Sequence, residues 1–158
     1  MATICAAKHV FLTLFVGRHE QEHSSSRAHS VTVRIVRLGT ARSRGEGLRI
    51  GTVRRPPRGV PKRQYATQNW YDLWLPELAP SARAVKLALA ALTKQQWDAF
   101  VRQYRTEMAA PEKVRLLKLL AALSQGANFS VGCYCADETH CHRSVLRALL
   151  REQGARLA

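Results

Sequence analysis

The chain has 158 residues, of which 46% are apolar and 23% charged, a composition typical of a globular protein and unlike that of a disordered chain. Its 25 Lys and Arg against 11 Asp and Glu give a net charge of +14, which favours anionic partners such as nucleic acid or a nucleotide; the alternative is a protein that is merely basic. No run of about 18 uncharged apolar residues occurs, so neither a membrane span nor a membrane partner is expected.

The first thirty residues differ from the rest of the chain. The apolar stretch "ICAAKHVFLTLFVG" is interrupted by Lys8 and His9, and the polar stretch "RHEQEHSSSRAHS" follows it. A signal peptide would need an uninterrupted apolar run and a small-residue cleavage site. We therefore expect residues 1–30 to be a disordered or loosely attached extension, and residues 31–158 to form the domain.

Two short strands are predicted next, at residues 31–38 and 48–53. In the first of them Val31, Val33 and Ile35 alternate with polar residues, which is the period of a half-buried strand. A glycine-rich loop separates the two strands, and a segment containing three prolines follows the second, where regular structure is excluded.

The second half is predicted to be mostly helical. Thr93 and Gln96 stand in capping-box spacing, and Pro111 suits the first turn of a helix. The expected elements are helices at about 79–92, 93–108 and 111–126, a strand at 128–135 and a helix at 140–154. Strands at the start and a strand–loop–helix unit at the end predict a single small α/β domain, with a short, mostly parallel sheet packed by helices.

The stretch "CYCADETHCHRS", residues 133–144, holds three of the four cysteines and lies between the last strand and the last helix. A helix start carries free N–H groups and a positive dipole end, which bind anions and lower the pKa of a thiol. We therefore predict Cys141 and Cys135 as reactive thiols, with Cys141 the more reactive because Cys135 is expected to be buried on the strand. His142 is predicted as a further catalytic residue and is expected to face inward with Val145 and Leu146. Arg143 and Ser144 are expected to bind an anion.

Two other interpretations of this stretch stay open. Cys133, Cys135 and Cys141 with His140 or His142 would supply three sulfurs and one nitrogen to a zinc ion, although the one-residue gap between the first two cysteines argues against it. The cysteines could also be buried without any chemistry. Apart from zinc, no cofactor is predicted. Clustered Cys and His without a disulfide framework fit a cytoplasmic protein.

The positive charge gathers in residues 27–63, which hold eleven basic residues and one acidic residue, a net of +10. Arg49, Arg54 and Arg58 are the predicted anion-binding residues of this segment, and Arg55 lies among them. The alternative is a solvated basic edge of the sheet. Trp70, Tyr71 and Trp74 follow; such aromatic residues stack on bases in some proteins but more often anchor a core.

At this point the residues resemble domain-of-unknown-function family 488, whose members include small bacterial proteins. "GLRIGTVRRPPRGV" (47–60), "WLPELAPS" (74–81), the helix with Trp97, Phe100 and Tyr104, and the closing "CYCADETHCHRS" carry the resemblance. It covers about residues 31–153. It implies an α/β fold with a site at the closing motif, and no established reaction.

The chain departs from the family pattern at two positions: Val53 stands where the family has Asp, and Pro56 where it has Trp. Any chemistry that needs this aspartate elsewhere in the family would be missing here.

These observations lead to two hypotheses. The first is an enzyme or sensor for a small phosphate- or carboxylate-bearing ligand, with the cysteines as thiolates and the arginines as clamps. The second is a nucleic-acid binding module that uses residues 27–63, with structural or zinc-binding cysteines. Convergence of the arginines and cysteines in one pocket would favour the first, and their separation the second. The sequence does not determine the oligomeric state.

Overall fold

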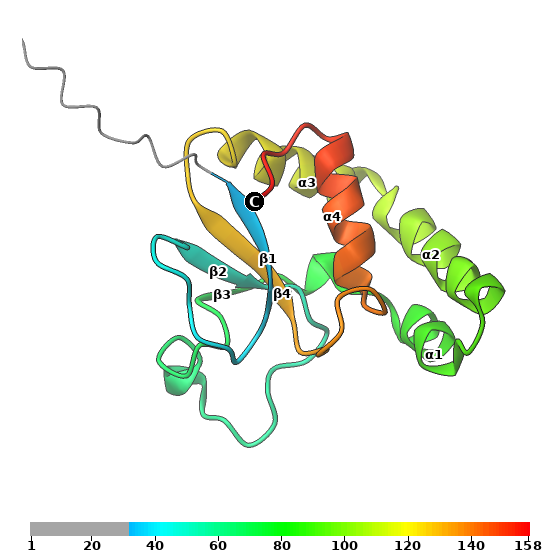
Figure 1. Cartoon of the computed structure of the whole chain (residues 1–158), viewed down its shortest axis with the longest axis horizontal. Helices are drawn as coiled ribbons and strands as arrows, with labels where there is room; N and C mark the ends of the chain where they lie inside the picture. The colour runs from blue at the N-terminus through cyan, green and yellow to red at the C-terminus, as the bar shows by residue number, and fades with distance from the viewer. Residues whose placement is uncertain (1–31) are drawn as a thin grey trace, which may run out of the picture.

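The structure, a computed structural model, describes residues 32–158 and has a four-stranded sheet at its centre (Figure 1). The strands, in the spatial order β1-β4-β2-β3, are β1 (Val33–Arg37), β4 (Phe129–Cys133), β2 (Leu48–Gly51) and β3 (Leu73–Trp74). Every pairing in this sheet is parallel. The predicted single α/β domain with a mostly parallel sheet is therefore confirmed, whereas the predicted extension at 1–30 lies outside the described residues.

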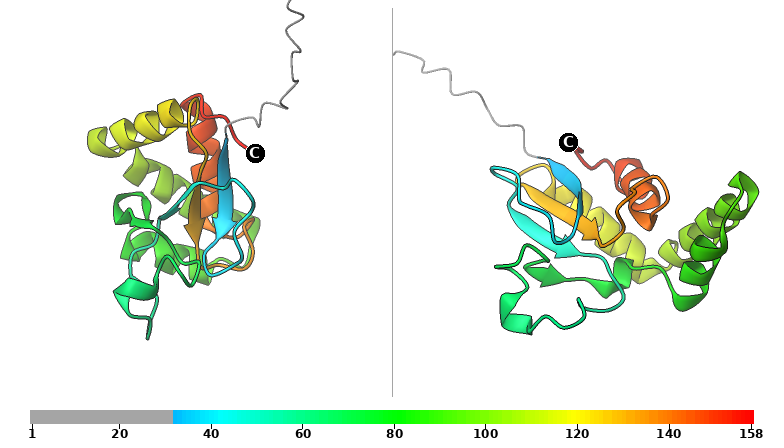
Figure 2. Two further views of the ribbon diagram at one scale, coloured as in Figure 1. Left: turned by 90° about the vertical axis from the view of Figure 1, so that its left-hand side faces the viewer. Right: turned by 60° about the horizontal axis from the view of Figure 1, so that its bottom comes forward.

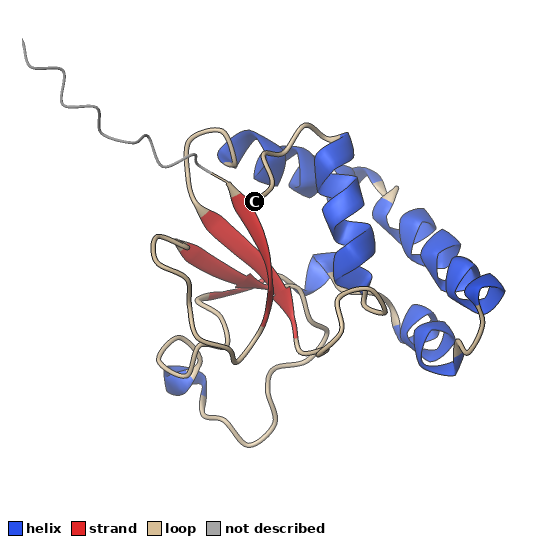
Figure 3. Cartoon of the chain, in the orientation of Figure 1, coloured by secondary structure: helices blue, strands red, loops and turns tan. Residues whose placement is uncertain are grey.

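Four α-helices lie together on one side of the sheet (Figure 3). They are α1 (Ala82–Ala90), α2 (Lys94–Met108), α3 (Pro111–Leu123) and α4 (His142–Glu152), and two short 3-10 helices span Lys62–Gln64 and Pro76–Leu78. The capping box predicted for α2 is present, with Thr93 accepting from Gln96 N and the Gln96 side chain accepting from Thr93 N. Within residues 32–158, no helix has the length and apolar character needed to cross a bilayer.

The core lies between the sheet and these helices. Along β4 the side chains alternate, so Phe129 and Val131 enter this core together with Ile50 of β2. The apolar stripe of α4 packs against them through Val145, Leu146, Leu149 and Leu150. β4 is buried along its whole length because strands flank it on both sides and α4 packs against it. This central position fixes the end of β4, where the cysteine stretch begins.

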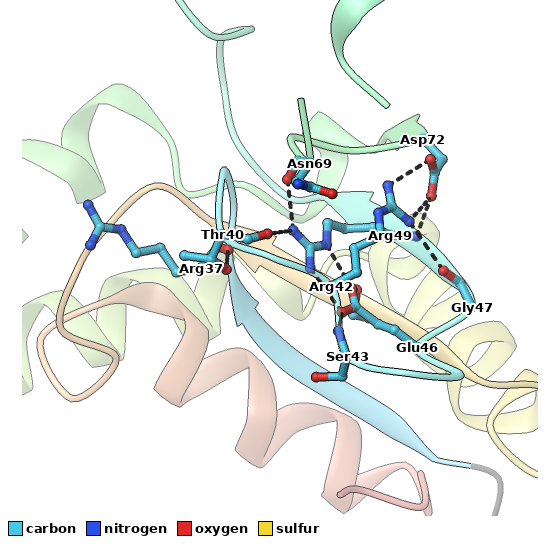
Figure 4. A network of polar contacts seen from close by, with 10 residues as sticks. Arg37, Thr40, Arg42, Ser43, Glu46, Gly47, Arg49, Asn69 and Asp72 are labelled. Carbon is cyan, nitrogen blue, oxygen red and sulfur yellow. Dashed lines mark hydrogen bonds and ion pairs between the residues drawn. The ribbon is translucent and has the colours of Figure 1, made fainter. Parts of the chain in front are cut away.

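Loops cover the other face of the sheet; Figure 2 (left) views the molecule from the sheet side, with the helices behind. There the Arg49 guanidinium is fully buried and pairs with Glu46, at 2.6 Å from Nε to Oε1 and 2.9 Å from Nη2 to Oε2 (Figure 4). Arg49 Nη1 also donates to the carbonyls of Thr40 and Asn69, and the Ser130 hydroxyl donates to Glu46.

The burial of Arg49 bears on its predicted role. Its donors are directed at Glu46 and at two backbone carbonyls, and its side chain has no exposed surface. Because a buried guanidinium needs a partner of opposite charge, these contacts make Arg49 part of the scaffold of the loops, and its anion binding stays a prediction.

Candidate functional site

The candidate site lies at the carboxyl ends of β2 and β4, from which the 52–61 loop and the 134–141 loop leave the sheet (Figure 1). Cys133 is the last residue of β4, Cys141 is the N-cap of α4, and Cys135 lies in the loop between them. Ligands of open parallel sheets bind at this edge, because each strand there is followed by a loop or by the start of a helix. The topology thus brings all three cysteines to the edge of the sheet where ligands bind.

The three sulfur atoms form one cluster, in which they all lie within 4.8 Å of one another. Cys133 Sγ is 3.7 Å from Cys135 Sγ. Cys133 and Cys141 are buried, whereas Cys135 is exposed. The expectation that Cys135 would be buried on the strand is therefore wrong, because β4 ends two residues earlier. The thiol open to solvent is Cys135, and Cys141 is only 2% exposed.

The pKa of Cys135 is lowered to about 3. The main cause is hydrogen bonding to its thiolate from the Cys133 thiol, followed by that from the Cys141 thiol, and the charge of Arg143 adds to the effect. The same hydrogen bond raises the pKa of Cys133, because Cys133 must keep its proton to donate it. The cluster therefore holds its first negative charge on the one sulfur that solvent reaches.

A histidine pairs with the third thiol. His142 Nδ1 lies 3.7 Å from Cys141 Sγ, and its Nε2 lies 3.3 Å from the Thr52 hydroxyl. That hydroxyl donates its single hydrogen to the Gly132 carbonyl, so it can only accept from His142 Nε2–H. Nδ1 is then the unprotonated nitrogen that faces Cys141. The pKa of Cys141 is lowered mainly by the hydrogen bond from the Cys133 thiol. His142 is buried, as its predicted inward orientation requires.

The first turn of α4 serves the site indirectly. Arg143 is 3% exposed, and its Nη2 donates to the Cys135 carbonyl at 2.8 Å; among the described residues its Nε has no hydrogen-bond partner. The Ser144 hydroxyl donates to the Cys141 carbonyl at 2.9 Å. Neither side chain lines the cavity described next. The contacts of Arg143 and Ser144 are thus with the backbone of Cys135 and Cys141, and their anion binding stays a prediction.

A cavity of about 930 Å³ opens in front of the thiols. Arg54 and Arg58 line it together with Cys135 and Cys141, and Arg49 does not. Its other lining residues include Arg37 and Arg55, the aromatic residues Trp70, Phe100 and Tyr134, and Val85, Ala88 and Leu89 of α1. The arginines of the proline segment and the cysteine cluster, about 80 residues apart in sequence, thus face one hollow.

Sequence reasoning missed part of this lining. Arg37 ends β1, and nothing in its surroundings distinguishes it from other arginines of the basic segment. Thr52 and the apolar face of α1 carry no motif, because their roles depend on the strand order. Of the three aromatic residues considered, Trp70 lines the cavity, Tyr71 is buried in the smaller core cluster, and Trp74 donates to the Val53 carbonyl.

The sulfur atoms satisfy part of the zinc hypothesis. Tetrahedral Zn–S bonds of about 2.3 Å place two sulfurs roughly 3.8 Å apart, close to the 3.7 Å between Cys133 and Cys135. His140, the predicted fourth ligand, is not part of the cluster: its Nδ1 lies 2.9 Å from an Asp137 carboxylate oxygen, and its side chain is 70% exposed. Among the described residues the cluster therefore offers three thiol ligands, and neither His140 nor His142 belongs to it as the predicted fourth ligand.

Comparison with known proteins agrees with this architecture. Residues 33–154 match the family DUF488-N3a, described as the active DUF488-N3 subclade. The chain belongs to this family. The match begins with β1 and ends just beyond α4, so it includes both the 52–61 loop, which carries Arg54 and Arg58, and the cysteine cluster. It confirms the resemblance seen in the sequence. No curated protein and no solved structure matches the chain.

Proposed function

We propose that this DUF488 protein is an enzyme or sensor that acts on a small phosphate- or carboxylate-bearing ligand, with Cys135 as its reactive thiolate. The observation that carries the proposal is the convergence of Arg54, Arg58 and Cys135 on one cavity. A thiolate is a strong nucleophile, and guanidinium groups bind carboxylate or phosphate with paired hydrogen bonds. Their combination suits a ligand whose anionic group is held while a neighbouring atom meets the sulfur.

Each residue of the cluster has a part in this proposal. Arg54 and Arg58 bind the anionic group, and the Cys135 thiolate meets the neighbouring atom of the ligand. Cys133 and Cys141 donate hydrogen bonds that keep Cys135 ionised, and Arg143 orients its backbone through the Cys135 carbonyl. Cys141, the thiol that the sequence favoured, is a supporting residue in this scheme because its sulfur is buried.

The test compares two alkylating reagents that differ in charge. The measured quantity is the ratio of the labelling rate by iodoacetate to that by neutral iodoacetamide. We expect this ratio to be about tenfold higher for Cys135 than for free cysteine, since a gain of about 1.4 kcal/mol is within reach of two cations that line the same cavity. Arg54→Ala/Arg58→Ala should bring the ratio close to that of free cysteine. Mass mapping after limited labelling identifies the modified residue.

Arg63→Ala is the matched control, because Arg63 is an exposed arginine of the same basic segment that does not line the cavity. It should leave the reagent ratio unchanged. A ratio equal to that of free cysteine in the wild-type protein, or a ratio indifferent to the double variant, would overturn the proposal.

The nucleic-acid module is the alternative function. Sharing of one cavity by the arginines and the cysteines supports the small-ligand proposal over it, because a backbone-binding surface does not need a thiolate beside its cations. The two functions also differ in the salt dependence of oligonucleotide binding.

A further inference from the structure

The cavity has an apolar wall that an inorganic anion would leave uncovered. Val85, Ala88 and Leu89 of α1 line it, and so do Trp70 and Phe100. Leu89 is 82% exposed although it belongs to this wall. A large apolar side chain open to solvent at the mouth of a polar site favours an occupant that covers it.

The packing of α1 explains why Val85 and Leu89 face the cavity. Ala84 and Ala88 are directed at the main core, where Ala84 is fully buried and Ala88 packs at the edge. Val85 and Leu89 are four residues apart and so share a neighbouring face of α1. α1 is therefore held by its core side while its Val85–Leu89 face stays free. In Figure 1 the 134–141 loop lies between the 52–61 loop and α1, and all three contribute to the cavity lining.

We infer that the ligand of this site is an aromatic or similarly flat apolar molecule that carries one anionic group. The inference rests on the proposed function and names its substrate class. The anionic group would lie against Arg54 and Arg58, and the flat part would extend over Val85 and Leu89. A cavity of about 930 Å³ has room for both parts, since pockets that bind ligands of this kind measure roughly 300–1,000 Å³.

The view from the carboxyl ends of the strands supports this placement (Figure 2, right). The α1–α2 hairpin projects to one side of the sheet. Cys135 is exposed and lines the cavity together with Val85 and Leu89, so a ligand that spans both regions would bring its apolar part to α1.

The experiment measures binding of three probes by calorimetry: 1-naphthyl phosphate, inorganic phosphate and 1-naphthol. We expect 1-naphthyl phosphate to bind at least tenfold more tightly than either of the other two. Leu89→Gln should weaken 1-naphthyl phosphate about threefold or more and leave inorganic phosphate unchanged. Because Leu89 is exposed, this substitution leaves the core intact.

Leu119→Gln is the matched control, since Leu119 is an exposed leucine of α3 outside the cavity. It should change no affinity. Equal affinities for 1-naphthyl phosphate and inorganic phosphate, or no effect of Leu89→Gln, would overturn this inference and leave the anion site standing. Failure of every phosphate probe to bind, together with an iodoacetate ratio equal to that of free cysteine, would overturn the proposed function as well.

Discussion

At the scale of single residues, the geometry selects Cys135 among three neighbouring thiols. Its sulfur is the exposed one, and the two buried thiols donate hydrogen bonds to it. A helix start has a smaller part in this choice than the sequence suggested, because Cys141, which caps α4, is covered by its surroundings. The cluster therefore acts as a unit, in which the buried members set the ionisation of the open one.

This arrangement predicts an unusual pH profile for alkylation of Cys135. With its pKa lowered to about 3, Cys135 is already ionised at pH 5, so its labelling rate by iodoacetamide should change less than about twofold from pH 5 to 8. An ordinary thiol with a pKa of about 8.5 would accelerate by several hundredfold over the same range. The rate is measured by mass spectrometry of the Cys135 peptide.

The double variant Cys133→Ala/Cys141→Ala removes both hydrogen-bond donors. It should raise the pKa of Cys135 and restore a rate that climbs with pH. A wild-type rate that already rises like that of free cysteine would contradict the hydrogen-bonded cluster.

At the scale of elements, local patterns predicted most of the fold. The alternation of β1, the capping box of α2 and Pro111 at the start of α3 each depend on a few adjacent residues, and the structure confirms them. β3 was missed because two residues are too few for a pattern. The burial of Arg49 and of Cys141 was missed because it depends on the position of β4 between β1 and β2, which no local pattern encodes.

The entry into β2 depends on a glycine. Gly47 has φ +74°, and a Cβ there would overlap the backbone oxygen of Asn128. Gly47→Ala should therefore lower the free energy of unfolding by about 3 kcal/mol or more, since strain in φ alone costs roughly 1–2 kcal/mol and the clash adds to it. Urea denaturation measures the change.

Gly59→Ala separates the two contributions. Gly59 has nearly the same φ, +73°, and no atom near the position of the added Cβ. It should lose only the cost of strain, about 1–2 kcal/mol. Equal losses of unfolding free energy in Gly47→Ala and Gly59→Ala would contradict the close approach of the Gly47 backbone to Asn128.

The loop that leads to β2 also contains a carboxylate sensitive to acid. Burial raises the pKa of Glu46, but hydrogen bonds from Arg49, Ser130 and Ser43 outweigh it and lower the pKa to about 2. Because this pKa is below its ordinary value of 4.5, Glu46 stabilises the fold fully at neutral pH, and the contribution is lost as pH falls from about 4.5 to 2. Glu46→Gln should flatten the acid limb of stability against pH.

The same variant should cost about 3 kcal/mol at pH 7, since Arg49 then keeps a buried charge without a charged partner. Glu152→Gln is the control, because its pair with Arg105 is about half exposed and should contribute at most about 1 kcal/mol. An acid limb as steep in Glu46→Gln as in the wild type would show that other carboxylates control acid unfolding.

At the scale of the whole molecule, the net charge of +14 attracts any polyanion, so weak binding of nucleic acid is not evidence for a nucleic-acid function. The small-ligand proposal predicts that affinity for a generic single-stranded oligonucleotide stays weaker than about 1 μM at physiological salt. It also predicts that the salt dependence follows total charge and not particular arginines. Arg54→Ala/Arg55→Ala/Arg58→Ala and the exposed control triple Arg44→Ala/Lys62→Ala/Arg63→Ala remove three charges each.

Both triples should therefore flatten the plot of log affinity against log salt by a similar amount, at most about 2 units for three lost phosphate contacts. The cavity triple should in addition abolish the preference of Cys135 for iodoacetate, which the control triple should leave intact. A sub-micromolar affinity for the oligonucleotide at physiological salt that only the cavity triple weakens would instead show that Arg54, Arg55 and Arg58 bind nucleic acid. The salt dependence of oligonucleotide affinity and the iodoacetate preference of Cys135 together distinguish the general positive charge of the surface from the specific effect of the arginines that share a cavity with the Cys135 thiolate.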